Sequence, residues 1–295
     1  MFRLTAHGYQ SGASLPGVDS SFYRDLAVTV TGSRATTELA GTVVSNPACG
    51  GPWHPELQHG GPPNALLVQL AELLAAEAAG RSDLAAVRLA AEFIGPVPVA
   101  PLTLTARVDR LSRTAVLVHA GLGEPGRTCL QARIWLLAPG DRPTAPARPA
   151  AVVPAPDSLP EFGFHDFPYA RHLDWRLASG NGRSPGPSAA WISARVPLLP
   201  DRQYSPLQRT ALFADSASGI SAELDWDRWS FANVDLDLHL FSAPSGDWLL
   251  VDAITELGAG VAMTRCRLSD RDGPVGAGLQ TLLVRRIEGR RAAAG

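Results

Sequence analysis

The chain of 295 residues contains no lysine, because all 26 of its basic residues are arginine. This absence excludes mechanisms that need a lysine Schiff base, a pyridoxal anchor or the lysine of a phosphate-binding loop. Cysteine is also scarce, and Cys49, Cys129 and Cys266 lie far apart in the sequence. An odd, scattered set of cysteines predicts neither a disulfide framework nor a zinc site built on paired cysteines.

The sequence also lacks a strong net charge and a long apolar run. Its formal net charge of −2 gives no global field for binding nucleic acid or an anionic membrane. The first ten residues have no apolar core of a signal peptide, and charged or polar residues interrupt the most apolar stretch, 65–79. With 45% hydrophobic residues, the chain can bury a large core. We expect a soluble, cytoplasmic protein that binds neither nucleic acid nor membranes.

A segment rich in proline divides the chain. Seven prolines fall between Pro139 and Pro160, and such a density predicts an extended segment with little helix or strand pairing. The sequence therefore predicts an N-terminal unit over 1–140, a linker over 141–185 and a C-terminal unit over 186–295.

The two units resemble each other in their pattern of strands. Alternating apolar residues predict strands at 102–110, 114–122 and 129–137 in the first unit, and at 234–241, 248–257, 261–269 and 275–284 in the second. Matching Val87 to Val234 and Gln131 to Gln280 gives separations of 147 and 149 residues. A tandem duplication explains this similarity.

Each unit has one helix ahead of its main run of strands. Residues 63–80 are apolar nearly all round and end at Gly80, which predicts a buried helix. In the second unit, Ser205 to Gln208 reads as a capping box with Pro206 at the first helical position, and the helix is expected to continue to Gly219. The predicted fold class is α+β, a double hotdog: two tandem units in which a long antiparallel sheet wraps around a central helix.

Three segments resemble known hotdog thioesterases. HGGPPNALL (59–67) is similar to the start of their central helix, and 212–240 and 273–284 resemble the C-terminal half of the acyl-CoA thioesterase II family. The resemblance implies thioester hydrolysis by a water that an aspartate, a hydroxyl residue and a glutamine hold in the second unit. Carried over by motif, these positions are Asp215, Asn233 and Gln280. Asn233 departs from the family, because it has no hydroxyl group, although a carboxamide can also orient water.

Asp215 is the leading candidate for the catalytic base. Its helical neighbours are apolar, so burial is expected to raise its pKa toward a value useful for general-base catalysis. Single hotdog thioesterases of the phenylacetyl-CoA type place their carboxylate nine residues after the histidine of His-Gly-Gly. From His59 that position is Val68, which also lies 147 residues before Asp215. One copy has lost the carboxylate and the other has kept it, which predicts one composite site. The alternative for Asp215 is a solvent-exposed helix position, and for Asn233 and Gln280 an ordinary place in a sheet.

His59, Gly60 and Gly61 precede the first helix and are the candidate substrate-binding residues. Glycine allows a ligand to come close, and the free amides of a helix N-terminus can stabilise an oxyanion. The alternative is a tight turn that only requires glycine. No zinc-ligand pattern, dinucleotide fingerprint or serine-hydrolase elbow is present, and no metal or redox cofactor is expected.

The main functional hypothesis is an acyl thioesterase of lipid metabolism that acts on an acyl-CoA or acyl-carrier substrate and forms a homo-oligomer. A second hypothesis is a hotdog enzyme with dehydratase- or cyclase-type chemistry on a polyketide-like substrate, which the missing hydroxyl at Asn233 motivates. A third is a non-catalytic acyl-binding protein, for which exchange of Asp215 would leave ligand binding unchanged.

Overall fold

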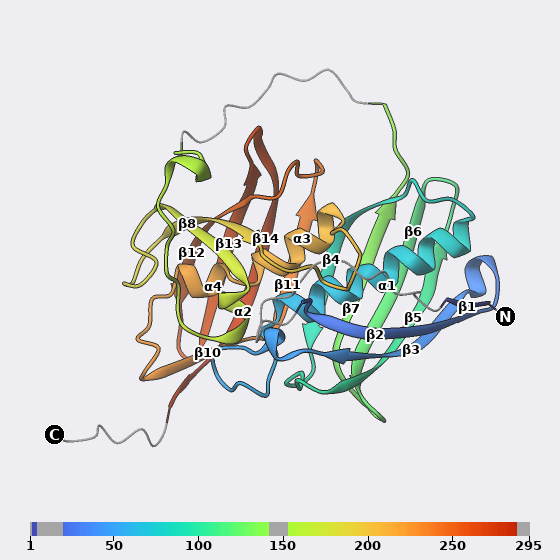
Figure 1. The fold of residues 1–295 in the computed structure, drawn as a ribbon, viewed down its shortest axis with the longest axis horizontal. Coiled ribbons are helices and arrows are strands. Elements are labelled where there is room, and N and C mark those ends of the chain that lie inside the picture. The colour runs from blue at the N-terminus through green and yellow to red at the C-terminus, as the bar shows by residue number, and fades with distance from the viewer. Residues whose placement is uncertain (1, 5–19, 142–152, 288–295) are drawn as a thin grey trace.

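The computed structural model describes residues 2–4, 20–141 and 153–287. They form a large antiparallel sheet with helices on one face (Figure 1). The strands are β1 (Phe2–Leu4), β2 (Tyr23–Thr31), β3 (Glu38–Ser45), β4 (Ala85–Phe93), β5 (Pro101–Leu111), β6 (Ala115–Glu124), β7 (Arg127–Leu137), β8 (Leu173–Ser179), β9 (Ser188–Ala194), β10 (Trp229–Asn233), β11 (Asp235–Leu240), β12 (Leu249–Leu257), β13 (Val261–Asp270) and β14 (Gly273–Arg286). The helices are α1 (Gly61–Ala79), α2 (Pro168–Arg171), α3 (Pro206–Ala214) and α4 (Ala217–Ile220).

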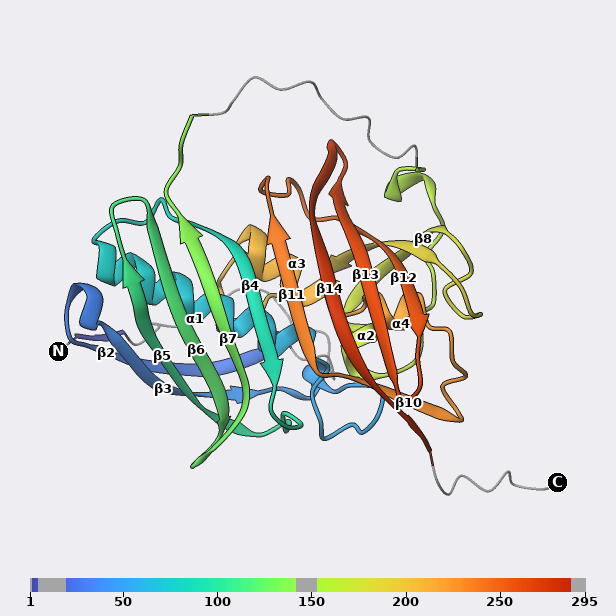
Figure 2. The ribbon, with the colours of Figure 1, turned by 180° about the vertical axis from the view of Figure 1, so that it is seen from behind.

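The sheet consists of two half-sheets joined edge to edge. Its strand order is β1-β2-β3-β5-β6-β7-β4-β11-β14-β13-β12-β9-β8, and β10 pairs with β14 outside this path. Seen from behind, β4 to β7 lie over α1, and β11 to β14 lie over α3 and α4 (Figure 2). This is the predicted double hotdog fold, with β4 and β11 at the centre of the sheet.

The strand pattern reflects burial on one face. In β5 the alternate residues Leu102, Leu104, Ala106 and Val108 are buried, as their spacing predicts. The buried side chains of both halves form one continuous apolar core, in which α1 packs against α3. The two halves are therefore held together by a shared core as well as by the β4–β11 pairing.

Helix α1 lies inside this core. It contacts β5, β6 and β7 on one side and α3 on another, which explains why it is apolar nearly all round. It ends at Gly80, whose φ of +64° is the left-handed conformation that glycine adopts most readily. Among the helices of residues 20–141 and 153–287, none combines the length and the apolar character needed to cross a membrane.

Helix α3 begins as predicted but ends early. Ser205 accepts a hydrogen bond from the Gln208 N–H, and the Gln208 side chain accepts one from the Ser205 N–H, which completes the capping box. The prediction that this helix continues to Gly219 is wrong, because α3 ends at Ala214. The Ser216 N–H donates to the carbonyl of Phe213, three residues back, so the last turn tightens at Asp215 before α4 begins.

The register between the two halves supports the duplication. Strands β4 and β11 are antiparallel neighbours, and Ala90 lies opposite Asp237, a separation of 147 residues. When two related strands pair antiparallel, a pseudo-twofold axis exchanges them. This axis passes through the two opposite residues whose separation in the sequence equals the repeat length. This register admits the separation of 147 residues deduced from Val87 and Val234 and excludes an even separation.

The sequence match between Gln131 and Gln280 is wrong by three residues. In the first half Ala91 pairs with Ala132, whereas its counterpart Leu238 pairs with Gly278. The separation between β7 and β14 is therefore 146 residues, and Ile134 is the counterpart of Gln280. The Gln131 side chain donates instead to the carboxylate of Glu92.

The proline-rich segment is described only in part, since residues 142–152 lie outside the described residues. Beyond them the chain forms a short 3-10 turn, Pro156–Ser158, followed by α2 and β8. Strand β8 pairs with β9 at the edge of the second half-sheet. The division at residues 140 and 186 stays a prediction, and within the predicted linker the structure places one helix and one strand.

Candidate active site

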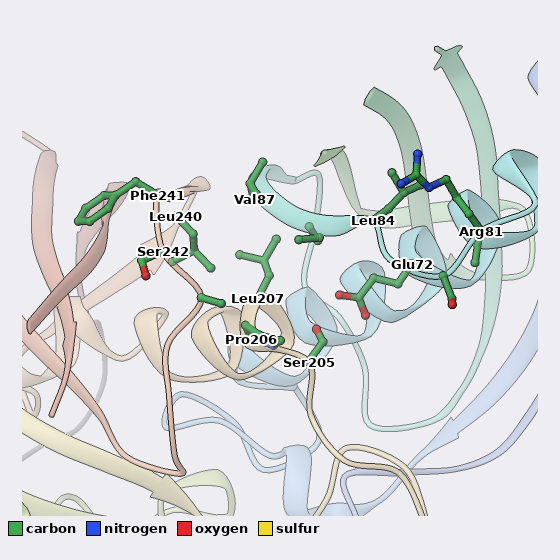
Figure 3. Close-up of a pocket in the computed structure, with 15 residues that line it drawn as sticks. Glu72, Arg81, Leu84, Val87, Ser205, Pro206, Leu207, Leu240, Phe241 and Ser242 are labelled. Carbon is green, nitrogen blue, oxygen red and sulfur yellow. The ribbon is translucent and has the colours of Figure 1, made fainter. Parts of the chain in front are cut away.

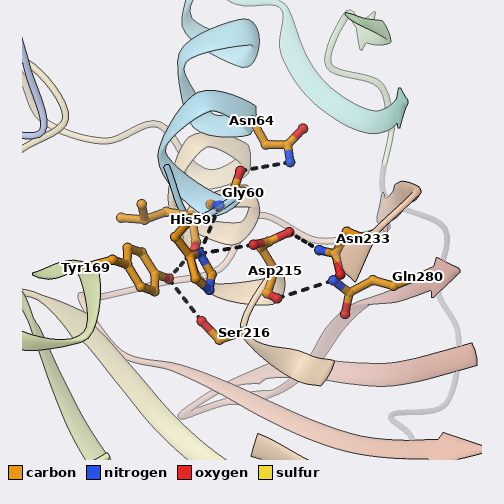
Figure 4. A network of polar contacts seen from close by, with 10 residues as sticks. His59, Gly60, Asn64, Tyr169, Asp215, Ser216, Asn233 and Gln280 are labelled. Carbon is orange, nitrogen blue, oxygen red and sulfur yellow. Dashed lines mark hydrogen bonds and ion pairs between the residues drawn. The ribbon is translucent and has the colours of Figure 1, made fainter. Parts of the chain in front are cut away.

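Asp215 lies where α3 ends, deep between the two halves (Figure 4). Only 3% of its surface is exposed to solvent. The early end of α3 places the carboxyl group next to the N-terminus of α1 from the other half. The expectation of an apolar, water-poor environment for this carboxyl group therefore agrees with its position.

Two side chains hold the two carboxylate oxygens of Asp215. The Asn233 carboxamide donates to Oδ1 at 2.5 Å, from the end of β10. The Nδ1 atom of His59 lies 3.0 Å from Oδ2. The Gly61 N–H donates to the same Nδ1 atom of His59 at 3.2 Å, and the backbone amides of Gly60 and Gly61 favour the ionised form of this carboxyl group. Residues from both halves thus converge on one carboxyl group.

Burial shifts the pKa of both ionisable groups in this cluster. Desolvation raises the pKa of Asp215 to about 7, although the hydrogen bonds from Asn233 and the two glycine amides favour its ionised form. Desolvation also lowers the pKa of His59 to about 3. At neutral pH the imidazole is therefore uncharged, while the carboxyl group is poised between its two protonation states. Such a carboxyl group can accept a proton and return it.

Gln280 approaches the same aspartate from β14. Its Nε2 atom donates to the Asp215 backbone carbonyl at 3.3 Å. Its Oε1 atom is buried and has no hydrogen-bond partner among the described residues. An unpaired buried acceptor costs free energy, which a water or substrate group placed there would recover. The three residues predicted for catalysis, Asp215, Asn233 and Gln280, are brought together.

The glycines before α1 allow the two halves to come close. A Cβ atom on Gly60 would lie 2.6 Å from Oδ1 of Asp215, and one on Gly61 would lie 2.2 Å from the carbonyl oxygen of Leu212. Close approach was predicted for a ligand, whereas here it serves the contact between α1 and the aspartate. The amides predicted to stabilise an oxyanion face the Asp215 carboxylate.

Tyr169, which lies in α2 within the predicted linker, was not predicted as a site residue. Its ring stacks on His59 with a centroid distance of 3.8 Å and an angle of 5°. Its hydroxyl donates to the carbonyl of Leu212 at 2.6 Å and lies 3.0 Å from the Ser216 hydroxyl. Tyr169 therefore fixes both the imidazole and the end of α3. No spacing in the sequence marks it, because its partners lie far away along the chain.

A cavity of about 460 Å³, hereafter the site cavity, opens beside Asp215 and Asn233. His59 and Gly60 also line it. Aromatic side chains dominate its apolar wall: Trp53, Phe93, Phe164, Phe167, Trp226 and Phe231. The described ranges contain no group of three His, Cys, Asp or Glu side chains placed to bind a metal ion. The arrangement offers one base, two carboxamides and an apolar space for an organic substrate.

Solved structures with the same fold include several related proteins. A candidate thioesterase from Novosphingobium aromaticivorans is 25% identical, with a TM-score of 0.66, over 86% of this chain and 97% of that chain. A hot dog protein of unknown function from Alicyclobacillus acidocaldarius is 14% identical, with a TM-score of 0.68, over 87% and 96%. A candidate thioesterase II from Thermobifida fusca is 18% identical, with a TM-score of 0.66, over 84% and 92%.

Comparison with the curated proteins finds no match. Two family models match consecutive parts of the chain. Residues 50–137 match the N-terminal domain of acyl-CoA thioesterase, and residues 139–284 match its C-terminal domain. Both domains of this family therefore occur in the chain, in N- to C-terminal order, and the chain belongs to the acyl-CoA thioesterase family.

Proposed function

We propose that the protein hydrolyses acyl thioesters with a water molecule that Asp215 activates. The observation that carries this proposal is the buried carboxyl group of Asp215, whose pKa is raised to about 7. The unpartnered Oε1 atom of Gln280 belongs to a side chain that donates to the backbone carbonyl of the same residue. A water between them would donate one hydrogen to each acceptor. Its oxygen lone pair would then be free to attack a carbonyl carbon.

Asp215 carries the proton between the two steps of the reaction. As the water oxygen forms a bond to the thioester carbon, its proton passes to the Asp215 carboxylate. The tetrahedral intermediate then expels the sulfur, which takes the proton from Asp215, so that a carboxylic acid and a thiol leave. Asn233 holds Oδ1 in one orientation throughout by its 2.5 Å hydrogen bond.

Negative charge on the intermediate needs a donor. The N-terminus of α1 directs the amides of Gly60 and Gly61 to this point, and its dipole favours negative charge there. In this mechanism the two amides stabilise the Asp215 carboxylate before the water attacks, and they stabilise the oxyanion of the intermediate afterwards. His59 stays uncharged, since burial lowers its pKa to about 3, and it positions Oδ2 of Asp215.

The substrate is an acyl group on coenzyme A or on a carrier, and the acyl part occupies the site cavity. Family membership supports the acyl-CoA class, and the apolar lining supports an acyl group. The hypotheses of a polyketide-like substrate and of a non-catalytic acyl-binding protein are separated from this one by the products. Hydrolysis releases a free thiol together with an open-chain carboxylic acid, whereas cyclisation of a thioester releases the thiol without the acid, and binding alone releases neither.

The test is a screen of acyl-CoA substrates from acetyl to palmitoyl, with a thiol reagent as readout. We expect turnover, and we expect Asp215→Asn to lower kcat about 10³-fold because it removes the base. Asp237→Asn is the control: this half-exposed carboxylate on β11 pairs with Arg88, so activity is expected to be unchanged. Thiol release by Asp215→Asn at the wild-type rate, with an unchanged melting temperature, would contradict the mechanism.

A further inference from the structure

A second cavity of about 540 Å³ lies between α1 and α3 (Figure 3). It opens at the end of the β4–β11 pair that is opposite to the site cavity. It lies near the C-terminal end of α1 and the N-terminal end of α3, whereas the site cavity lies at their opposite ends. The pseudo-twofold axis through Ala90 and Asp237 exchanges these two places. The second cavity is thus a candidate counterpart of the site cavity.

The residues that line the two cavities confirm this correspondence. Ten of the fifteen residues around the second cavity have a counterpart, 147 positions away, that lines the site cavity. Leu84 and Ala85 correspond to Phe231 and Ala232, for example, on the strands at each mouth. A chance hollow on the surface would not repeat the site cavity position by position. The duplicated fold therefore retains two binding cavities.

The second cavity lacks the groups that could cleave a thioester. At the counterpart positions of Asp215, Asn233 and Gln280 the chain has three buried apolar residues: Val68, Ala86 and Ile134. These three positions offer neither a base nor a carboxamide to hold water, and the Glu72 carboxyl group that lines the cavity is already bound by the Gln208 side chain. A ligand bound in this cavity would therefore stay intact.

The second cavity keeps an apolar wall and one carboxyl group. Leu84, Val87 and Leu240 provide aliphatic surface, and Glu72 occupies the counterpart position of Gly219. Burial raises the pKa of Glu72, and the Gln208 side chain donates to its Oε2 atom. The carboxyl group can accept a hydrogen bond from an amide N–H of a ligand, such as those of a pantetheine arm.

We propose that the second cavity binds an acyl thioester of coenzyme A without hydrolysing it, so that each chain binds two molecules and cleaves one. This inference rests on the proposed function, from which it takes the class of ligand. It goes beyond that function because it assigns a binding role to a part of the duplicated fold that carries no catalytic group.

The test uses two matched alanines, one at each cavity. Ala85 and Ala232 are counterparts, both exposed, and each lines its own cavity. Tryptophan at either position is expected to obstruct one cavity without disturbing the core. The probe is S-hexyl-coenzyme A, a thioether that cannot be hydrolysed, and its binding is measured by equilibrium dialysis with the full-length protein.

We expect wild type to bind two molecules of probe per chain. Ala85→Trp is expected to bind one and to hydrolyse acyl-CoA at the wild-type rate, whereas Ala232→Trp is expected to bind one and to lose hydrolysis. Glu72→Gln should weaken the second binding event about tenfold, as expected for loss of a hydrogen bond to a charged group.

Failure of the inference differs from failure of the proposed function. Thiol release together with one bound probe per chain, unaffected by Ala85→Trp, would overturn the second site and leave the hydrolytic site intact. Two bound probes without thiol release from any acyl-CoA would instead overturn the function and retain the cavity. A wild-type chain that binds no probe would overturn the second site.

Discussion

The two cavities occupy equivalent places in a duplicated fold, but only one of them has polar residues at the catalytic positions. Asp215, Asn233 and Gln280 of the second half correspond to Val68, Ala86 and Ile134 of the first. Asp215 and Asn233 line the site cavity, and Ala86 lines the second cavity. The difference therefore lies in side-chain chemistry and not in backbone architecture.

The difference shows that these polar groups depend on one another. A buried polar group is costly unless it has a hydrogen-bond partner. The partners of the Asp215 carboxyl group are Asn233 for Oδ1 and, from the first half, His59 for Oδ2. Without the Asp215 side chain, the Asn233 carboxamide would lose its acceptor, whereas Gln280 would keep its hydrogen bond to the backbone carbonyl of residue 215. The first half has apolar residues at all three positions, which is the other consistent solution.

The largest effect on stability is expected when a single polar group of the catalytic site is introduced at its counterpart position in the first half. Val68→Asp places a carboxyl group at a fully buried position where Ala86 and Ile134 offer no hydrogen bond. We expect it to lower the free energy of unfolding by about 3–5 kcal/mol. Urea denaturation measures this change, and Val68→Thr, which replaces one methyl group by an uncharged hydroxyl group, is the matched control.

A companion variant sharpens this result. Val68→Asp combined with Ala86→Asn supplies the partner that Asp215 has in Asn233, so part of the lost stability should return. A Val68→Asp variant as stable as Val68→Thr would show that position 68 is accessible to water, and the account of the difference would be wrong.

The next largest effect concerns the contact between the halves. A Cβ atom at Gly60 would lie 2.6 and 2.7 Å from the two carboxylate oxygens of Asp215, so the carboxyl group must move. We expect Gly60→Ala to lower kcat/KM about 10²-fold, as misplaced catalytic groups do. Gly140→Ala is the control, since a Cβ atom there has open space around it. A Gly60→Ala enzyme with wild-type kcat/KM would mean that Asp215 does not act from this position.

Many of the strands and helix ends could be predicted from the sequence, because periodic patterns and helix caps are local. Alternation marked β5, β6, β7 and β11 to β14, and Gly80 and Ser205 marked helix ends. The strands β1 to β4 and β8 to β10 were not predicted, and the end of α3 was misplaced at Gly219. That end depends on Tyr169, which bonds to the carbonyl of Leu212 from 43 residues away in the chain.

The partners within the site were harder to predict than its members. Asp215 and Gln280 were named through a family resemblance, but the contact of His59 with Asp215 joins residues from different halves. Such a contact depends on how the halves pack, which no local pattern records. The match of Gln131 with Gln280 failed for a related reason, because strand register is set by pairing and not by residue type.

A smaller, graded effect is expected from pH. The base must be ionised to accept a proton, and burial raises the pKa of Asp215 to about 7. The fraction of active enzyme therefore falls as pH drops below 7, and kcat/KM should decrease about tenfold per pH unit there and level off above 8. The measurement is kcat/KM between pH 5 and 9, and an inflection near 4, as for an exposed aspartate, would contradict the assignment.

The smallest effect is expected from copying one residue of the first half into the second. Asn233→Ala introduces the side chain found at Ala86 and removes the hydrogen bond to Oδ1 of Asp215. We expect kcat/KM to fall about tenfold, which matches the loss of one hydrogen bond to a charged group. The inflection in the pH profile should also move upward, because Asn233 favours the ionised carboxylate. Asn233→Ser keeps a donor at this position and should restore both kcat/KM and the inflection. If Asn233→Ala lowers kcat/KM without moving the inflection, Asn233 acts on the substrate and not through Asp215.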